Sequence, residues 1–414
     1  MESSTLDTYL NRYADLTVRV GVGLREGQRV VVRSPIDAAP LVRKIVEKAY
    51  DAGAPYVHVM WSDDQVEKAR FLHAPEDSFE EVPLGMADVL TAMAERGDAF
   101  IAITANDPEA LKDADPARIS TARAAASKSL KAWRKLQMSD AVPWTVIAAP
   151  SVGWARKVFP GETDEVAVDK LWDAIFKAIR LDQEDPVAAW EAHIDALEVR
   201  ANYLNEQRFS ALHFRGEGTD LVVGLADGHI WKAGASFTQA GQRFVANMPT
   251  EEVFTAPHAM RVDGTVRASL PLSTGGHLIK DFWLRFEDGK VVEAHAEEGQ
   301  DVLDRLLDMD EGARRLGEVA LVSADSPIRK SVDLFFNTLF DENAASHTAL
   351  GEAYRFSAKG GIEASDEQAA AIGLNSSLIH VDFMIGAPES HVEGVHEDDS
   401  RLPIIEQGLF VPPA

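Results

Sequence analysis

A strand, a helix and a second strand follow one another in residues 29–61, RVVVRSPIDAAPLVRKIVEKAYDAGAPYVHVMW. The apolar run at 29–33 predicts a buried strand, and apolar residues at helical spacing in 40–50 predict an amphipathic helix that ends at Gly53. The apolar run at 56–61 predicts the next strand. This order predicts two parallel strands joined by a right-handed helical crossover.

The same alternation continues through the first half of the chain. The predicted elements are a helix at 86–96, a strand at 99–104, a long helix at 117–136, a strand at 144–149, and helices at 164–179 and 186–205. Strands separated by helices predict an α/β domain whose parallel sheet is covered on both faces.

The second half has a different pattern, in which apolar residues alternate with polar ones and turn residues recur. Hairpins are predicted for 221–233 and for 282–295, and helices for 300–316 and from Asp341 onward. The chain therefore predicts an α/β domain over 1–205 and an α+β domain rich in antiparallel strands over 206–414. The length of 414 residues fits two domains better than one.

Composition narrows the possible functions. Lys and Arg number 41 against 67 Asp and Glu, and the net charge of −26 disfavours nucleic acid and anionic membranes as partners and favours a cationic substrate. The absence of cysteine leaves only nitrogen and oxygen donors for a metal. The first residues do not resemble a secretory signal, and the sequence contains no apolar run of about 18 residues, so we expect a soluble cytoplasmic protein.

His380 and Asp382 occupy alternate positions in the apolar segment 377–385. Alternate residues of a strand point to the same face, so these two side chains would form a ligand pair on a rigid support. The ordinary alternative is an edge strand with a solvated polar face. Apolar neighbours on both sides of the pair argue against that alternative.

A second histidine follows the acidic residues Asp341 and Glu342. The alanine-rich run after them predicts a helix, which would place His347 and Tyr354 two turns apart on one face. The ordinary alternative is a histidine and a tyrosine packed in an interface. Several carboxylates also interrupt apolar stretches, namely Glu251 with Glu252 and Glu318, and a buried carboxylate is costly without a cation.

Four segments together carry a family resemblance. They are PTEEVFTAP at 249–257, LGEVAL at 316–321, TLFDENAASH at 338–347 and HVDFMIG at 380–386. In order and spacing they resemble the aminopeptidase T and aminopeptidase S family of metallopeptidases, and the likeness covers nearly the whole chain.

The resemblance implies an aminopeptidase that releases amino-terminal residues through a water activated by two divalent ions. It implies a metal shell made of Glu252, Glu318, Glu342, His347, His380 and Asp382, with Tyr354 as a catalytic phenol and Glu342 also a candidate catalytic residue. Oxygen and nitrogen ligands leave zinc, cobalt, manganese and magnesium possible. The resemblance further implies peptide substrates with a free amino terminus and a homodimer.

Two assignments stay open at this point. The spacing to Glu318 in the family that the chain resembles favours Glu252 over Glu251 as the residue that points inward. Glu342 could bridge the metals or act as a general base.

Other features of the sequence favour other functions less well. The cluster at 391–399, which contains His391 and His396, is typical of an exposed hairpin turn. An oxidoreductase would need a glycine-rich fingerprint after the strand at 29–33, and residues 34–37 do not supply one. A non-catalytic peptide-binding relative would be expected to have lost metal ligands, whereas every expected ligand is present. A serine hydrolase is disfavoured because the sequence contains no Gly-x-Ser-x-Gly motif.

Overall fold

A computed structural model describes residues 2–105, 107–274 and 277–411 of the chain. The chain separates into two compact units, Met1–Ala192 with Ala235–Pro249, and His193–Gly234 with Thr250–Ala414. The first of the three divisions along the chain falls within helix α9 (Pro186–Gln207), in which the predicted domain boundary near residue 205 also lies, and residues 235–249 return to the first unit.

The first unit is built on a parallel sheet of four strands in the order β2-β1-β3-β4. The strands are β1 (Val30–Pro35), β2 (Val57–Ser62), β3 (Ala99–Thr104) and β4 (Trp144–Ala148). Between β1 and β2 runs α2 (Ala39–Asp51), which buries Leu41, Val42, Ile45 and Ala49 as the helical spacing predicts. The predicted α/β first half is confirmed.

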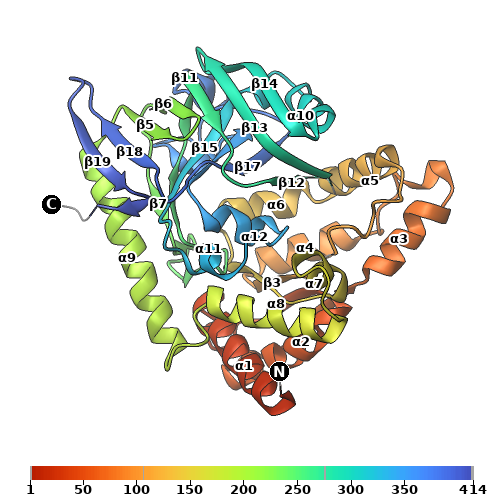
Figure 1. Ribbon diagram of the computed structural model, residues 1–414. Helices are drawn as coiled ribbons and strands as arrows, with labels where there is room; N and C mark the ends of the chain where they lie inside the picture. Colours follow the sequence, from red (N-terminus) through yellow and green to blue (C-terminus); the bar gives the residue numbers. More distant parts are fainter. Residues whose placement is uncertain (1, 106, 275–276, 412–414) are drawn as a thin grey trace. The chain divides into compact units, whose positions relative to one another are not determined.

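The other helices of this unit are labelled in Figure 1. They are α1 (Ser3–Leu16), α3 (Asp64–His73), α4 (Met86–Glu95), α5 (Pro116–Ser129), α6 (Lys131–Met138), α7 (Val152–Val158) and α8 (Asp164–Ala178). The unit also contains a short antiparallel hairpin of β8 (Ser236–Phe237) and β9 (Arg243–Phe244). The single long helix predicted at 117–136 is wrong. Leu130 leaves the helical conformation, with ψ of 6°, and divides it into α5 and α6.

The second unit contains a larger, antiparallel sheet of nine strands in the order β12-β13-β11-β6-β5-β18-β19-β20, with β14 paired to β13. Its strands are β5 (Ala211–Gly216), β6 (Thr219–Leu225), β11 (Pro257–Arg267), β12 (Leu272–Thr274), β13 (His277–Glu287), β14 (Lys290–Glu298), β18 (His391–Val395), β19 (Arg401–Glu406) and β20 (Leu409–Phe410). Helix α10 (Gln300–Leu307) lies against the β13–β14 hairpin (Figure 1). That predicted hairpin and the predicted α+β class are confirmed.

A second sheet of this unit has five strands in the order β17-β16-β15-β10-β7. They are β7 (Lys232–Ala233), β10 (Glu252–Thr255), β15 (Leu316–Val322), β16 (His347–Gly351) and β17 (His380–Met384), and each adjacent pair is antiparallel. Short helices α11 (Pro327–Ser331), α12 (Thr338–Asp341) and α13 (Asp366–Ala371) complete the unit. The five-stranded sheet carries most of the predicted site residues.

Three local predictions for the second unit are wrong. No helix begins at Asp341 and continues to Tyr354, because residues 347–351 form a strand with hydrogen-bonded partners on both sides. The predicted hairpin at 221–233 does not form, because β7 pairs with β10 instead of β6. The helix predicted at 300–316 ends at Leu307, and a 3-10 turn at Gly312–Arg314 follows.

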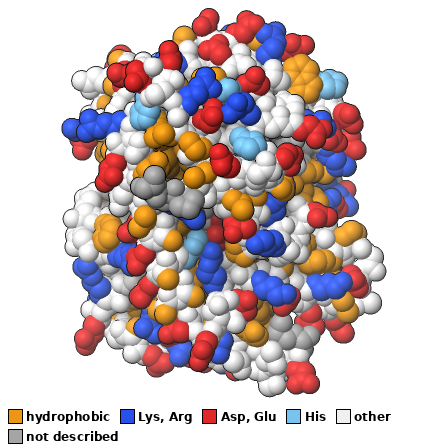
Figure 2. All heavy atoms as spheres, turned by 60° about the vertical axis from the view of Figure 1, so that its left-hand side comes forward, with side chains coloured by type: hydrophobic (Ala, Val, Ile, Leu, Met, Phe, Trp, Pro, Cys, Tyr) orange, Lys and Arg blue, Asp and Glu red, His pale blue; other side chains and the backbone are white. Residues whose placement is uncertain are grey.

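Acidic and basic side chains are interspersed over the face of the molecule in Figure 2. The excess of negative charge is therefore distributed on this face and not gathered in one patch. Among the described residues, no helix combines the length and the apolar character needed to cross a membrane.

Candidate metal centre

The site is built on one face of the five-stranded sheet. In an antiparallel pair, residues directly opposite each other point to the same face, and the face alternates along each strand. The register pairs Ala320 with His347, Ala349 with Glu318 and with Asp382, and Gly351 with His380. Glu252 pairs with Val322 on the same face. Four neighbouring strands thus present Glu252, Glu318, His347, His380 and Asp382 together.

Small residues separate these side chains. Ala320 and Ala349 are fully buried on the same face and add only methyl groups to it. Gly351 has a φ of +109°, and a Cβ there would lie 2.1 Å from the carbonyl oxygen of Ile379. The sheet face therefore leaves room between the carboxylates and imidazoles, and the chain at Gly351 needs glycine to pass close to β17.

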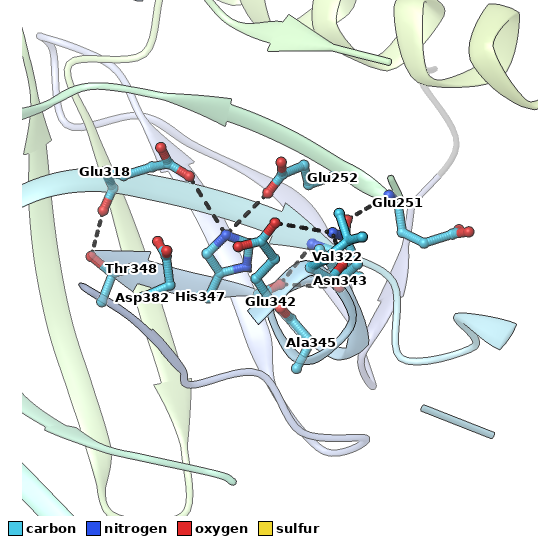
Figure 3. A network of polar contacts seen from close by, with 12 residues as sticks. Glu251, Glu252, Glu318, Val322, Glu342, Asn343, Ala345, His347, Thr348 and Asp382 are labelled. Carbon is cyan, nitrogen blue, oxygen red and sulfur yellow. Dashed lines mark hydrogen bonds and ion pairs between the residues drawn. The ribbon is translucent and has the colours of Figure 1, made fainter. Parts of the chain in front are cut away.

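The five side chains form two overlapping triads, Glu252 with Glu318 and His347, and Glu318 with His380 and Asp382. In each triad the potential ligand atoms lie within 4.8 Å of one another. His347 Nε2 lies 3.0 Å from Glu252 Oε2 and 3.5 Å from Glu318 Oε1, as Figure 3 illustrates. His380 Nε2 lies 3.7 Å from Glu318 Oε2 and 3.5 Å from Asp382 Oδ1. Glu318 is the member that the triads share.

Both imidazoles are oriented by backbone carbonyls. His347 Nδ1 lies 3.1 Å from the oxygen of Ala345, and His380 Nδ1 lies 2.7 Å from the oxygen of Glu352. A carbonyl oxygen can only accept, so Nδ1 carries the hydrogen in both rings and Nε2 faces the carboxylates. Histidines that bind metals are commonly held in this way, with the second ring nitrogen donating to a carbonyl.

Glu342 reaches the site from outside the sheet. It begins the 3-10 turn Glu342–Ala344 that follows α12, and its carboxylate lies beside His347 in Figure 3. It belongs to neither triad. Its Oε1 accepts a long hydrogen bond of 3.4 Å from the amide of Asn343.

Glu251 and Glu252 take opposite directions. The Glu252 carboxylate faces His347, whereas the Glu251 side chain points away from His347 (Figure 3) and its Oε2 lies 3.7 Å from His193 Nε2. Both are buried. The geometry brings Glu252, and not Glu251, into the cluster, as the spacing to Glu318 suggested.

Tyr354 lies next to His380, although not on the predicted helix. It directly precedes the 3-10 turn Arg355–Ser357, and its ring centroid is 4.6 Å from that of His380. The phenol ring also stacks on Phe356 at 5.1 Å. Phe254, which shares the sheet face of Glu252, meets it edge-on at 6.4 Å. Phe254 is not among the predicted site residues, and its position two residues after Glu252 on the same strand is the signal that could have indicated it.

The proton equilibria of the metal-free site reflect burial and crowded negative charge. Burial raises the pKa of Glu318 to about 7, and the charges of Asp382 and Glu252 add to that effect. Burial also raises the pKa of Glu342 and of Tyr354, in both cases with the neighbouring carboxylates. Burial lowers the pKa of His380, but its contact with Asp382 and the charge of Glu318 outweigh burial and raise it to about 9. The site therefore has a strong preference for added positive charge.

The residues present fit a divalent cation. All donor atoms are oxygen or nitrogen, and no cysteine exists in the chain. Asp382 Oδ1 is buried and accepts no well-formed hydrogen bond within the part of the chain that the structure describes, since His380 Nε2 lies 3.5 Å away. A buried carboxylate oxygen without a donor is costly, and a metal ion would satisfy it.

The alternative cluster does not gather ligands. His391 lies on β18, and its Nε2 is 3.2 Å from Gln407 Nε2, whereas the His396 ring lies 4.7 Å from the ring of Phe209. Neither histidine belongs to a possible metal-binding group among residues 2–105, 107–274 and 277–411.

A sheet face on which buried carboxylates surround two imidazole nitrogens is typical of a metalloenzyme. The chain belongs to the thermophilic metalloprotease family M29, whose model matches residues 6–410.

Known relatives agree with this assignment. The chain is 48% identical to aminopeptidase T of Thermus aquaticus over 97% of this chain and 98% of that protein. It is 47% identical to aminopeptidase 2 of Geobacillus stearothermophilus over 96% and 97%. The structure of wild-type AmpT from Thermus thermophilus matches with a TM-score of 0.93 at 46% identity, covering 98% of this chain and all of that chain. The predicted family and the predicted class of enzyme, a metalloaminopeptidase, are confirmed.

Proposed function

We propose that the protein removes amino-terminal residues from peptides with two divalent ions held in the overlapping triads. The observation that carries the proposal is the orientation of both histidines, whose Nδ1 atoms are held by carbonyls while their Nε2 atoms face carboxylates. Glu252 and His347 would hold one ion, His380 and Asp382 the other, and Glu318 would serve both.

Bound divalent ions would polarise the scissile carbonyl and lower the pKa of a shared water toward about 7. Glu342 lies outside both triads and beside them, which favours a role as general base over a role as bridging ligand. Its carboxylate would take the proton from the attacking water and pass it to the leaving amine.

Tyr354 would act on the carbonyl oxygen. Burial and nearby carboxylates raise the pKa of its phenol, so the hydroxyl keeps its proton and can donate a hydrogen bond to the charge that develops on that oxygen. Its ring is fixed by stacking on Phe356 and by contact with His380.

Exopeptidase specificity would come from the substrate's ammonium group. The carboxylates of the site attract a cation, and the net charge of −26 attracts it over longer range. A homodimer and a cytoplasmic location belong to the same proposal, on the ground of the family resemblance, and light scattering and cell fractionation would measure them.

The direct experiment combines metal analysis with hydrolysis of amino-acid anilides before and after chelation. We expect about two equivalents of metal per chain, loss of hydrolysis on removal, and recovery with zinc, cobalt, manganese or magnesium. Activity that persists after exhaustive chelation would overturn the proposal, and the metal that restores most activity identifies the preferred ion.

A further inference from the structure

Asn343 connects two parts of the site that are far apart in the sequence. It is 0% exposed and lies in the 3-10 turn directly after Glu342. Its side-chain oxygen accepts a hydrogen bond of 2.7 Å from the backbone N–H of Glu251, 92 residues away. Glu251 is the residue immediately before Glu252, so this bond fixes the start of β10.

The other end of the same amide is held on the turn. Its Nδ2 donates to the carbonyl oxygen of Leu339 at 3.1 Å and to Glu342 Oε1 at 3.4 Å. Figure 3 displays the bonds of Asn343 to both sides of the site. The backbone oxygen of Asn343 accepts a further bond from the Ser326 hydroxyl at 2.9 Å.

This arrangement needs a group that accepts at one end and donates at the other. A carboxylate of the same shape could accept from Glu251 but could not donate to Leu339 or Glu342, and an apolar side chain could do neither. The amide therefore ties the backbone just before Glu252 to the turn that begins at Glu342.

We propose that Asn343 is a positioning residue that holds Glu252 and Glu342 at a fixed separation for the metal centre. This inference rests on the proposed function, because it assigns a task to Asn343 only if Glu252 binds metal. This role does not require Asn343 to contact the substrate.

The test uses Asn343→Asp and Asn343→Leu in the full-length protein, with zinc affinity measured by chelator competition and bound zinc measured by elemental analysis. Loss of hydrogen bonds in the outer shell of a metal site typically weakens metal binding by roughly 10- to 100-fold, and Asn343 belongs to that outer shell through the backbone next to Glu252. We expect that loss in both variants, with a lower kcat and a smaller change in KM. Asn343→Asp should be the more affected in zinc-saturated kcat, because it places a carboxylate beside Glu342.

Asn205→Asp is the matched control. The Asn205 amide also bridges backbone groups, donating to the oxygen of Trp231 at 3.0 Å and accepting from its nitrogen at 2.8 Å, but it touches no residue of the metal site. Its substitution should lower the melting temperature without changing zinc affinity. If Asn343 had only a structural role, Asn343→Asp and Asn343→Leu would likewise have a lower melting temperature without a selective loss of zinc.

The outcomes separate this inference from the proposed function. A wild-type protein that binds no divalent metal refutes both. A wild type that binds and needs metal, with position-343 variants of unchanged zinc affinity, refutes only the role of Asn343. If both position-343 variants fail to fold in saturating zinc while Asn205→Asp folds, Asn343 serves the fold and the inference is wrong.

Discussion

Ala349 of β16 is the direct register partner of Glu318 of β15, so a methyl group stands beside the carboxylate that both triads share. On its other side the same alanine pairs with Asp382. The smallest side chain with a defined direction therefore occupies the middle of the site, and the space above it is available to the ligands around it.

Replacing Ala349 with leucine should disable the site by filling that space. Extra methylene groups in a packed position typically cost about 1–3 kcal/mol, and here the larger side chain would displace Glu318 or Asp382. We expect loss of at least one metal equivalent and of hydrolysis, measured by elemental analysis and anilide assay. Ala313→Leu, at an equally buried alanine outside this sheet, is the control for overpacking alone. Full metal content in Ala349→Leu would mean that the ligands meet elsewhere.

Metal binding should release protons and strengthen as pH rises. In the metal-free protein the pKa of His380 is about 9, so this imidazole carries a proton at neutral pH and must lose it to bind a metal. At pH values below this pKa, protons compete with the metal ion for the His380 imidazole. Affinity should therefore increase by about tenfold per pH unit for each proton released.

Calorimetry of metal binding in two buffers with different ionisation enthalpies measures the protons released, and chelator competition gives the affinity at each pH. An affinity that does not vary between about pH 7 and 9 would contradict protonation of His380 in the metal-free site.

Tyr354→Phe should lower turnover without loss of metal. Phenylalanine keeps the contacts with His380 and Phe356 and removes only the hydroxyl. Deletion of one preorganised donor to a developing oxyanion typically lowers kcat by roughly a hundred- to a thousand-fold. KM should change much less, because the bond strengthens mainly in the transition state. Tyr203→Phe, at a partly buried tyrosine packed on the core, should leave kcat unchanged. Near-normal kcat in Tyr354→Phe with full metal would leave the ring only a packing role.

Substitution of His391 and His396 together by asparagine should leave metal content unchanged. The two side chains contact Gln407 and Phe209, respectively, and loss of the ring contact at His396 should lower stability by about 0.5–1.5 kcal/mol. His347→Ala, measured in parallel by elemental analysis, should lose metal. Loss of one equivalent from the double variant would place a metal site at the β18–β19 hairpin.

Peptides with an acetylated amino terminus should resist hydrolysis. Acetylation removes the positive charge that the acidic site is proposed to bind, and the expected loss is in kcat/KM. Matched free and acetylated peptides, followed by chromatography of the products, measure this directly. Equal cleavage of both peptides would indicate an endopeptidase.

The strand at His380 and Asp382 illustrates what local sequence determines. Alternation with a period of two is a property of the extended backbone itself, so these residues share a face wherever the strand is placed. The same reasoning applies to the parallel sheet of the first unit. Apolar runs predict its buried strands, and apolar residues at helical spacing predict the amphipathic helix α2. The resemblance then identified the family, because four separated motifs occur in its order.

Tertiary structure decided the rest. The alanine-rich run after Glu342 has a local preference for helix, but residues 347–351 lie between β15 and β17, whose hydrogen bonds outweigh a propensity difference of less than about 1 kcal/mol per residue. The choice between Glu251 and Glu252 also depends on pairing, since the register with β15 determines which of two adjacent side chains faces His347. The bridging amide of Asn343 joins residues 92 positions apart, and local sequence carries no information about a contact that only folding creates.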